Sequence, residues 1–331
     1  MKKLSVIIPV YNVAQYVEKC LRSVLDNDLA QQDIEIIVVD DQSPDHSVEI
    51  VRDIARDHPN ITVISQKNKG LGGARNTGIV HATGAYILFL DADDWINPGM
   101  LSKTVHHVLN TQVDVLEFGA EGITPDGTIT YRNAISSNGT NYSGVVYALR
   151  FHYMWSACNK LYRTAFLKEN ELYFMEQIYF EDLEFFTRMI PKVQQMQAVD
   201  DIVASFYQSG DSITRHNSDA KKQKAYRDIV TIIERLHGQL VKVDRQQTGQ
   251  RQFYLQYLGI LVVTLFYQFV KNRERAALAD TYRTELRQGG MYYVDHRIVP
   301  AQKDVFRRIF LKNFWLLRIL LALKTPGSAV E

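Results

Sequence analysis

Cysteine is scarce in this sequence: only two occur among 331 residues, Cys20 and Cys158. Both are flanked by core-like sequence, and two cysteines are too few for a disulfide scaffold or a cysteine-based zinc site. An excess of one charge is also absent, because 38 lysines and arginines stand against 37 aspartates and glutamates. This balance points to no polyanionic partner. We therefore expect a protein of a reducing compartment that does not bind nucleic acid.

A recognisable secretion signal and a long apolar run are lacking as well. The apolar stretch at residues 4–10 is short, Pro9 interrupts it, and no small-residue cleavage site follows. We predict that it is the first strand of an intracellular, cytoplasmic protein. Residues 257–267 are strongly apolar, but they are too few to span a bilayer. We predict a helix buried in a bundle there, with membrane insertion as the less favoured alternative.

What the sequence does contain is a regular alternation of apolar, β-branched runs and helical patterns. Buried strands are predicted at residues 4–10, 34–39 and 85–90, and a further strand at 61–65. Helices are predicted after Asn12 as N-cap, from Ser43 as N-cap and Pro44 to about residue 57, and from 74 to 82. This order requires right-handed parallel crossovers, so we expect a doubly wound α/β sheet over about the first 95 residues.

Acidic residues follow two of the predicted strands, and a glycine-rich loop follows a third. Asp40 and Asp41 come after the second strand, and Asp91, Asp93 and Asp94 come after the fourth. Ligands of such sheets bind beyond the carboxyl ends of the strands. Asp91 and Asp93 point the same way in extended backbone and repel each other unless a cation compensates them. We therefore predict Mg²⁺ or Mn²⁺ with substrate phosphates there, rather than a solvated acidic turn.

The pattern changes after residue 95 and again near residue 219. Residues 113–119 and 199–207 have the pattern of strands, and the polar stretch 122–144 indicates a hairpin or a loop over the crevice. Proline is absent from residues 220–287, where we predict two or three long helices.

The last segment, residues 302–324, mixes cations with aromatic and aliphatic residues. At helical periodicity it has one polar arc with Asp304, Arg307 and Arg308 near its middle, and toward Leu323 the apolar residues go nearly all round. A basic amphipathic helix of this type can lie in an anionic membrane interface. Packing on its own domain or on a second subunit is the open alternative.

Five motifs together resemble those of glycosyltransferase family 2, the inverting sugar-nucleotide transferases with the GT-A fold. They are Ser5-Val6-Ile7-Ile8-Pro9-Val10-Tyr11-Asn12, Ile36-Ile37-Val38-Val39-Asp40-Asp41-Gln42-Ser43, Gly72-Gly73-Ala74-Arg75-Asn76-Thr77-Gly78, Leu90-Asp91-Ala92-Asp93-Asp94 and Glu181-Asp182. The resemblance covers roughly residues 4–215, and Gln42 departs from it because the family usually has glycine there. It implies a GT-A (Rossmann-like), mostly parallel sheet with helices on both faces.

The resemblance also implies a domain division. Residues 1–215 would be the catalytic domain, with a nucleotide-binding part to about 95 and an acceptor part at 96–215. Residues 216–331 would be a helical region that ends in the basic tail. We expect acceptor choice to reside in residues 120–215 and the helical region.

The donor-binding roles that the resemblance implies fall on the first three motifs. Asp41, together with Asp40, would recognise the nucleobase. Pro9 and Tyr11 would hold the nucleoside. Arg75 would sit by the nucleotide.

The remaining implied roles concern the reaction itself. Asp91 is placed for the ribose, Asp93 for the divalent metal, Mn²⁺ or Mg²⁺, that bridges the diphosphate, and Asp182 for the catalytic base. Further contacts with the diphosphate or the acceptor are predicted for Trp155, Lys160, Glu181 and His216.

The resulting hypothesis is a metal-dependent, inverting hexosyltransferase that uses a sugar nucleotide, UDP-linked in most of the family. Its acceptor would be a hydroxyl of a glycan or lipid-linked molecule, in cell-surface polysaccharide synthesis at the cytoplasmic membrane face. A homo-oligomer stays open. A sugar nucleotidyltransferase is less favoured, because no glycine-rich loop directly follows the first strand. A non-catalytic carbohydrate-binding protein is the other alternative, but Asp93 and Asp182 are both present.

Overall fold

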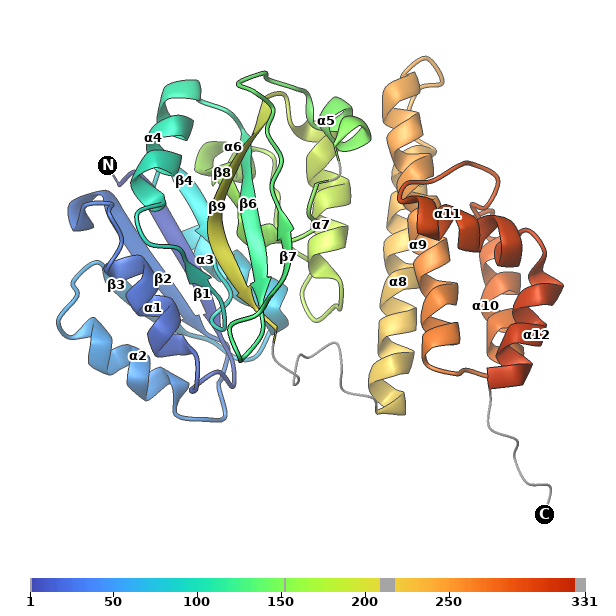
Figure 1. Cartoon of the computed structure of the whole chain (residues 1–331), viewed down its shortest axis with the longest axis horizontal. Coiled ribbons are helices and arrows are strands. Elements are labelled where there is room, and N and C mark those ends of the chain that lie inside the picture. Colours follow the sequence, from blue (N-terminus) through green and yellow to red (C-terminus); the bar gives the residue numbers. More distant parts are fainter. Residues whose placement is uncertain (1, 152, 209–217, 325–331) are drawn as a thin grey trace. The chain divides into compact units, whose positions relative to one another are not determined.

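The computed structural model describes residues 2–151, 153–208 and 218–324. The chain divides into two compact units, residues 1–217 and 218–331, whose elements run from blue to yellow and from orange to red in Figure 1. The predicted boundary at residue 215 falls in the segment 209–217, outside the described residues. Each unit has its own buried apolar core.

Four parallel strands form the first half of the sheet in the N-terminal unit. β1 (Leu4–Val10) pairs with β2 (Ile34–Asp40) on one side and with β4 (Tyr86–Phe89) on the other, and β3 (Ile61–Ser65) pairs with β2. Every residue of β1 and β4 is buried, because these strands are covered on both faces. The predicted parallel sheet is confirmed for this part of the chain.

The second half of the sheet is mixed. β8 (Lys160–Arg163) runs antiparallel to β4, and β6 (Val115–Ile123), β9 (Met196–Tyr207) and β5 (Trp95–Ile96) follow it. β7 (Ile129–Asn133) forms an antiparallel hairpin with β6. The polar stretch after residue 122 therefore contains the predicted hairpin. The full order is β3-β2-β1-β4-β8-β6-β9-β5, with β7 beside β6.

Three helices connect the parallel strands, and their predicted starts are wrong. α1 (Val17–Leu25), α2 (Ser47–Ala55) and α3 (Gly70–His81) begin elsewhere than expected. Asn12 does not cap a helix, because it has a φ of 57° and its N–H donates to Ser43 Oγ. Ser43 and Pro44 likewise precede α2 instead of starting it. Local capping rules failed here because the polar side chains of residues 43–47 bond to the backbone of residues 12–14.

The glycine-rich segment at residues 67–73, predicted as a loop, is helical from Gly70 onward, where α3 begins. Gly72 lies in α3, where a Cβ would overlap with the Met175 carbonyl oxygen. Gly78, one helical turn past Arg75, faces Ile7 of β1, and a Cβ there would overlap with the isoleucine side chain. The glycines therefore allow close packing of α3 between the sheet and the following chain. Other helices of this unit are α4 (Leu101–Thr111), α5 (Gly144–Arg150), α6 (Thr164–Glu169) and α7 (Glu181–Met189).

The C-terminal unit is helical. α8 (Asp219–Leu240), α9 (Thr248–Lys271) and α10 (Ala276–Gln288) are the predicted long helices. α9 is long and apolar enough to cross a membrane, but 72% of its most apolar window is buried inside the unit. It packs against α8, and we interpret it as the core helix of the bundle.

The C-terminal segment differs from the single amphipathic helix that we predicted. α11 (Ala301–Phe306), a π-helical segment (Arg307–Leu311) and α12 (Phe314–Lys324) follow one another. The predicted polar arc faces solvent only in part: Arg308 is exposed, whereas Asp304 and Arg307 are 5% and 3% exposed and form an ion pair of 2.8 Å. The pair faces inward because it holds the preceding loop, where Ile298 N–H donates to Asp304 and Arg307 donates to the Val294 carbonyl.

Candidate active site

One buried guanidinium brings together three carboxylates from two distant parts of the sequence. Arg75, on α3, is 1% exposed. Its Nη1 lies 2.6 Å from Asp182 Oδ1 and 3.1 Å from Glu181 Oε1, and its Nη2 lies 2.8 Å from Asp91 Oδ1. Asp91, just beyond β4, and the first turn of α7 therefore meet at the side chain of Arg75. Phe174 covers the guanidinium, with its ring centroid 5.2 Å away.

Asp182 is held by both of its carboxylate oxygens. Oδ1 accepts from Arg75, and Oδ2 accepts from the backbone N–H of Ala157 at 3.0 Å. Its side chain is 23% exposed, so it is oriented by the protein and still reaches the surface of the site. Phe180, just before α7, has a φ of 64°, a strained conformation for an aromatic residue that turns the chain into this helix.

Glu181 and Asp182, in the first turn of α7, both have raised pKa values. Burial, and next the negative charge of Asp182, raise the pKa of Glu181 to about 7. Burial also raises the pKa of Asp182, against the lowering effect of Arg75. A carboxylate that is ionised yet has a raised pKa is a better proton acceptor than one in water.

The acids after β4 form a second concentration of negative charge. Burial, and next the charge of Asp91, raise the pKa of Asp93 to about 6. Asp94 is 8% exposed, and its Oδ1 accepts from Tyr207 N–H at 2.8 Å, which gives it a partner within the protein. No group of three or more potential metal ligands converges among the described residues. Asp93 has no ion-pair partner among the described residues, and Asp91 pairs with Arg75 through Oδ1 only. These acids fit Mg²⁺ or Mn²⁺, since such ions take one or two protein carboxylates and complete their shell with phosphate and water oxygens.

The acids at the end of β2 lie at the same edge of the sheet. Asp41 is 3% exposed, and its Oδ1 accepts from Gln66 Nε2 and from Lys69 N–H at 2.7 and 2.8 Å. Asp40 Oδ1 accepts from Ser43 N–H at 2.8 Å. Gln42 has a φ of 63°. The turn therefore keeps a left-handed residue at the position of the family's usual glycine, and both acids stay in place.

The predicted nucleoside contacts differ in exposure. Pro9 is buried within β1, opposite Val39 of β2. Tyr11 is 48% exposed just beyond the end of that strand. Tyr11 is therefore free to contact a ligand through its ring, whereas Pro9 can act only by shaping the strand end.

Lys160 does not fit the direct diphosphate contact predicted for it. The side chain is 0% exposed, and its Nζ donates to the carbonyl oxygens of Met154 and Ser156 and to Asn159 Oδ1. Glu117 Oε1 lies 3.8 Å from Nζ and supplies the compensating charge. The sequence shows a lone lysine at the start of a strand, and only the fold reveals that it is enclosed.

The remaining predicted contacts are Trp155, Glu181 and His216. Trp155 is half-buried on the loop before β8, its ring centroid 5.3 Å from that of Tyr153. Glu181 is part of the Arg75 cluster. His216 lies outside the described residues. The Ala157 N–H, which sequence reasoning missed, carries no side-chain signal that could have revealed it.

Comparison with known proteins gives a consistent result. The family model of glycosyl transferase family 2 matches residues 5–170, half of the chain. The uncharacterized glycosyltransferase EpsJ of Bacillus subtilis is 32% identical over 218 residues, which are 64% of this chain and 62% of that protein. The poly(ribitol-phosphate) beta-N-acetylglucosaminyltransferase TarS of Staphylococcus aureus is 31% identical over 191 residues, 56% of this chain and 32% of TarS. The match thus spans less than two thirds of either relative.

Solved structures show the same fold. The structure of TarS residues 1–349 with UDP-GlcNAc has a TM-score of 0.61 and 23% identity, over 88% of this chain and 93% of that one. The mannosyltransferase PcManGT from Pyrobaculum calidifontis, in complex with GDP-Man and Mn²⁺, has a TM-score of 0.56 and 15% identity, over 99% and 88%.

Proposed function

Because the chain belongs to glycosyl transferase family 2, we propose that it moves a sugar from a UDP-linked donor to a hydroxyl of a glycan or lipid-linked acceptor. The observation that carries this proposal is the Arg75 cluster, in which Asp91 and Asp182 bond to the two terminal nitrogens of one guanidinium. The predicted donor side of the site and the predicted base are thereby adjacent. Synthesis of a cell-surface polysaccharide is the proposed setting, supported by relatives such as TarS and the minor teichoic acid biosynthesis protein GgaB.

The donor would bind along the carboxyl edge of the parallel strands. Asp41 has one carboxylate oxygen engaged by Gln66 and Lys69, and its Oδ2 remains to accept from a nucleobase N–H. The exposed Tyr11 would cover the nucleoside, and Asp91 would accept from the ribose hydroxyls. Neighbouring structures that hold UDP-GlcNAc and GDP-Man support a nucleotide-sugar donor of this kind.

Asp182 would act as the general base. An acceptor hydroxyl has a very high pKa and attacks poorly unless a carboxylate takes its proton as the new bond forms. The oxygen–carbon bond to the acceptor forms while the bond to the diphosphate breaks, and the proton passes to Asp182. Because one displacement occurs on the face opposite the leaving group, the anomeric centre inverts. Ala157 N–H and Arg75 hold the carboxylate for this step.

Asp93 would hold the divalent metal, with Asp91 beside it as a helper. When bound, Mn²⁺ or Mg²⁺ neutralises the charge that develops on the departing diphosphate. Burial and the charge of Asp91 raise the pKa of Asp93, so a cation bound at this carboxylate would be stabilised. A neighbouring structure that contains Mn²⁺ supports the choice of ion.

The test is transfer and hydrolysis with a panel of UDP-, GDP- and dTDP-sugars, with Mn²⁺, Mg²⁺ or EDTA. We expect activity with a UDP-sugar that EDTA abolishes, and a loss of at least about 10²-fold in Asp182→Asn. Asp53→Asn, on the exposed face of α2, is the matched control because it removes the same charge far from the cluster. Full activity of a folded Asp182→Asn protein would exclude the residue as base, and full activity in EDTA would exclude the metal.

The same proposal places the enzyme at the cytoplasmic face of a membrane. Trp315, Ile319 and Leu323, spaced four residues apart on α12, are 62%, 49% and 80% exposed. Arg308 precedes α12 and Arg318 lies on it; their side chains are 62% and 60% exposed, and each pairs with one acid, Asp304 and Asp280. An exposed apolar stripe beside cations suits an anionic lipid interface, where the acceptor of a surface polysaccharide is made.

A further inference from the structure

The balance of charge in the whole chain hides an asymmetry between its two units. Residues 218–331 contain 20 lysines and arginines against 10 aspartates and glutamates, whereas residues 1–217 contain 18 against 27. The helical unit is therefore strongly basic on its own. A basic surface raises the local concentration of anionic ligands.

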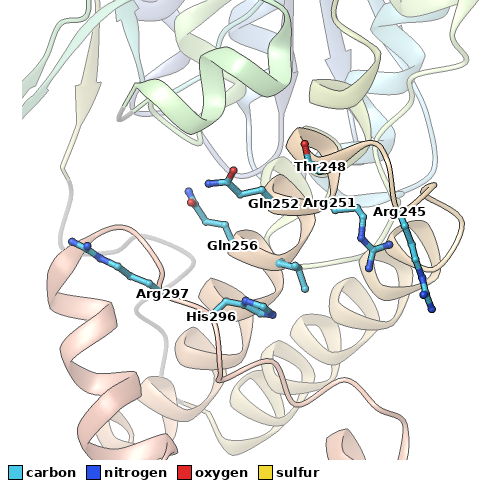
Figure 2. A pocket seen from close by; sticks show the side chains of 8 residues that line it. Arg245, Thr248, Arg251, Gln252, Gln256, His296 and Arg297 are labelled. Carbon is cyan, nitrogen blue, oxygen red and sulfur yellow. The ribbon is translucent and has the colours of Figure 1, made fainter.

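Part of this positive charge lines a pocket of about 350 Å³ at the start of α9. Figure 2 shows Arg245 and Arg251 at one end of the pocket and Arg297 at the other. Gln252 and Gln256, from the first turns of α9, lie between them. His296 reaches the pocket from the loop before α11.

The three arginines are not neutralised by the protein. Among the described residues, none of them forms an ion pair with an acid, and no aspartate or glutamate lines the pocket. The one side-chain bond of this group that the structure records is from Arg251 Nη1 to the Val243 carbonyl, at 3.1 Å, and it leaves the rest of the guanidinium available. Cationic donors gathered without a counter-charge favour an anionic ligand.

The identity of the donors narrows the class of ligand. Guanidinium groups match phosphate oxygens with paired N–H donors, and carboxamides can both donate to and accept from hydroxyls. No tryptophan, tyrosine or phenylalanine lines the pocket, so there is no platform on which a nucleobase would stack. The volume lies at the small end of the range for sites that bind small molecules.

We propose that this pocket binds a phosphate group attached to a polyol or sugar, with the phosphate on Arg245 and Arg251 and the hydroxyls on Gln252 and Gln256. Arg297, at the opposite end, would take a second phosphate where such units are linked in series. The site lies in the helical unit, apart from the residues proposed for transfer, and it would hold a phosphate-bearing acceptor rather than the donor. Its role as acceptor site rests on the proposed function, but binding itself does not.

The experiment measures binding by the full-length protein, saturated with UDP and Mg²⁺ so that the donor site is occupied. The probes are glycerol 1-phosphate, glycerol as the uncharged match, and dihexanoyl phosphatidylglycerol below its micellar concentration. The test variant is Arg245→Gln with Arg251→Gln, and the control is Arg275→Gln, an exposed arginine of the same unit outside the pocket. Thermal unfolding of each variant checks that it is folded.

We expect glycerol 1-phosphate to bind and glycerol not to bind, with at least tenfold weaker binding in the double variant and wild-type binding in Arg275→Gln. Equal affinity for the two phosphates identifies a soluble or polymeric polyol phosphate as ligand, and much tighter binding of the lipid identifies a lipid headgroup. Equal binding by the folded double variant and the wild type, or no binding of either phosphate, overturns the proposal. Because the readout is binding, loss of transfer activity alone leaves this result unaffected.

Discussion

The buried Lys160 ammonium influences the chemistry of the site although it cannot touch a substrate. Burial lowers the pKa of Lys160, while the charge of Glu117 raises it. The positive charge of Lys160 in turn lowers the pKa of Asp182. Its hydrogen bonds to Met154 and Ser156 hold the loop that presents the Ala157 N–H to Asp182. Lys160 is thus a positioning residue for the proposed base.

Lys160→Met should shift the pH dependence of transfer. The base works only when ionised, so the rate falls as the pH drops through the raised pKa of Asp182. Without the lysine charge that pKa rises further, and we expect the acid limb to move to higher pH. The measurement is kcat/KM from pH 5 to 9, with Lys103→Met, an exposed lysine, as control. A lowered rate with an unmoved acid limb would mean that Lys160 supports only the fold.

A second residue-scale prediction concerns Gln42. A left-handed residue other than glycine costs about 1–2 kcal/mol, and glycine relieves this cost. We expect Gln42→Gly to raise the free energy of unfolding slightly, by up to about 1 kcal/mol, and Gln42→Val to lower it by about 1–2 kcal/mol. Urea unfolding measures both. Gln32→Gly is the control, because Gln32 is exposed and has no positive φ, and it should not stabilise. Destabilisation by Gln42→Gly would show that the side chain, rather than the backbone, decides stability there.

At the scale of elements, the position of α3 determines where the guanidinium of Arg75 lies. The helix approaches β1 closely at Gly78, one turn beyond Arg75. The sheet in turn places Asp91 at the end of β4, beside β1. The distance between helix and sheet is therefore coupled to the Arg75–Asp91 and Arg75–Asp182 bonds.

Gly78→Ala should consequently reduce both stability and activity. The added methyl overlaps with Ile7, and overpacking of this kind costs about 1–3 kcal/mol. Gly238→Ala, near the end of α8, is the matched control because nothing lies within 4 Å of its Cβ position. That change should stabilise by about 0.5–1 kcal/mol. Denaturant unfolding and transfer assays of both variants test the prediction, and equal effects at the two glycines would contradict it.

At the scale of the whole molecule, α12 has two apolar sides, one buried and one exposed. Phe314, Leu317 and Leu321 are buried and pack within the helical unit. Trp315, Ile319 and Leu323 are exposed. Deleting α12 would remove its buried side chains together with its exposed ones and would unpack the unit. Substitutions on the exposed side alone are therefore the better test.

Trp315→Ser combined with Leu323→Ser should weaken binding to anionic vesicles several-fold without unfolding the protein. Flotation with phosphatidylglycerol-containing liposomes at low salt measures the effect, because burial of these side chains in the interface drives binding. Val241→Ser is the control, because Val241 is an apolar residue of the same unit and is 64% exposed. Equal flotation of the double variant and the wild type would show that these exposed side chains do not contribute to membrane binding.

The amino-acid sequence by itself determined the strands β1 and β2, because a run of buried β-branched residues can satisfy few other environments. It also predicted β3, which is only partly buried. Through the resemblance of its motifs to the family, it also predicted roles for Asp91, Asp93 and Asp182, and these roles stay predictions. The long helices of the C-terminal unit followed from the absence of proline in residues 220–287.

Only the tertiary structure decided which of these residues meet. The Arg75–Asp182 bond joins residues 107 positions apart, and no local pattern records such a contact. The helix starts near Asn12 and Ser43 were wrong because partners across the fold satisfied the backbone there. Enclosure of Lys160 and of the Asp304–Arg307 pair likewise depends on what packs over them. Charge and polarity can be read along a chain, whereas burial is a property of the assembled fold.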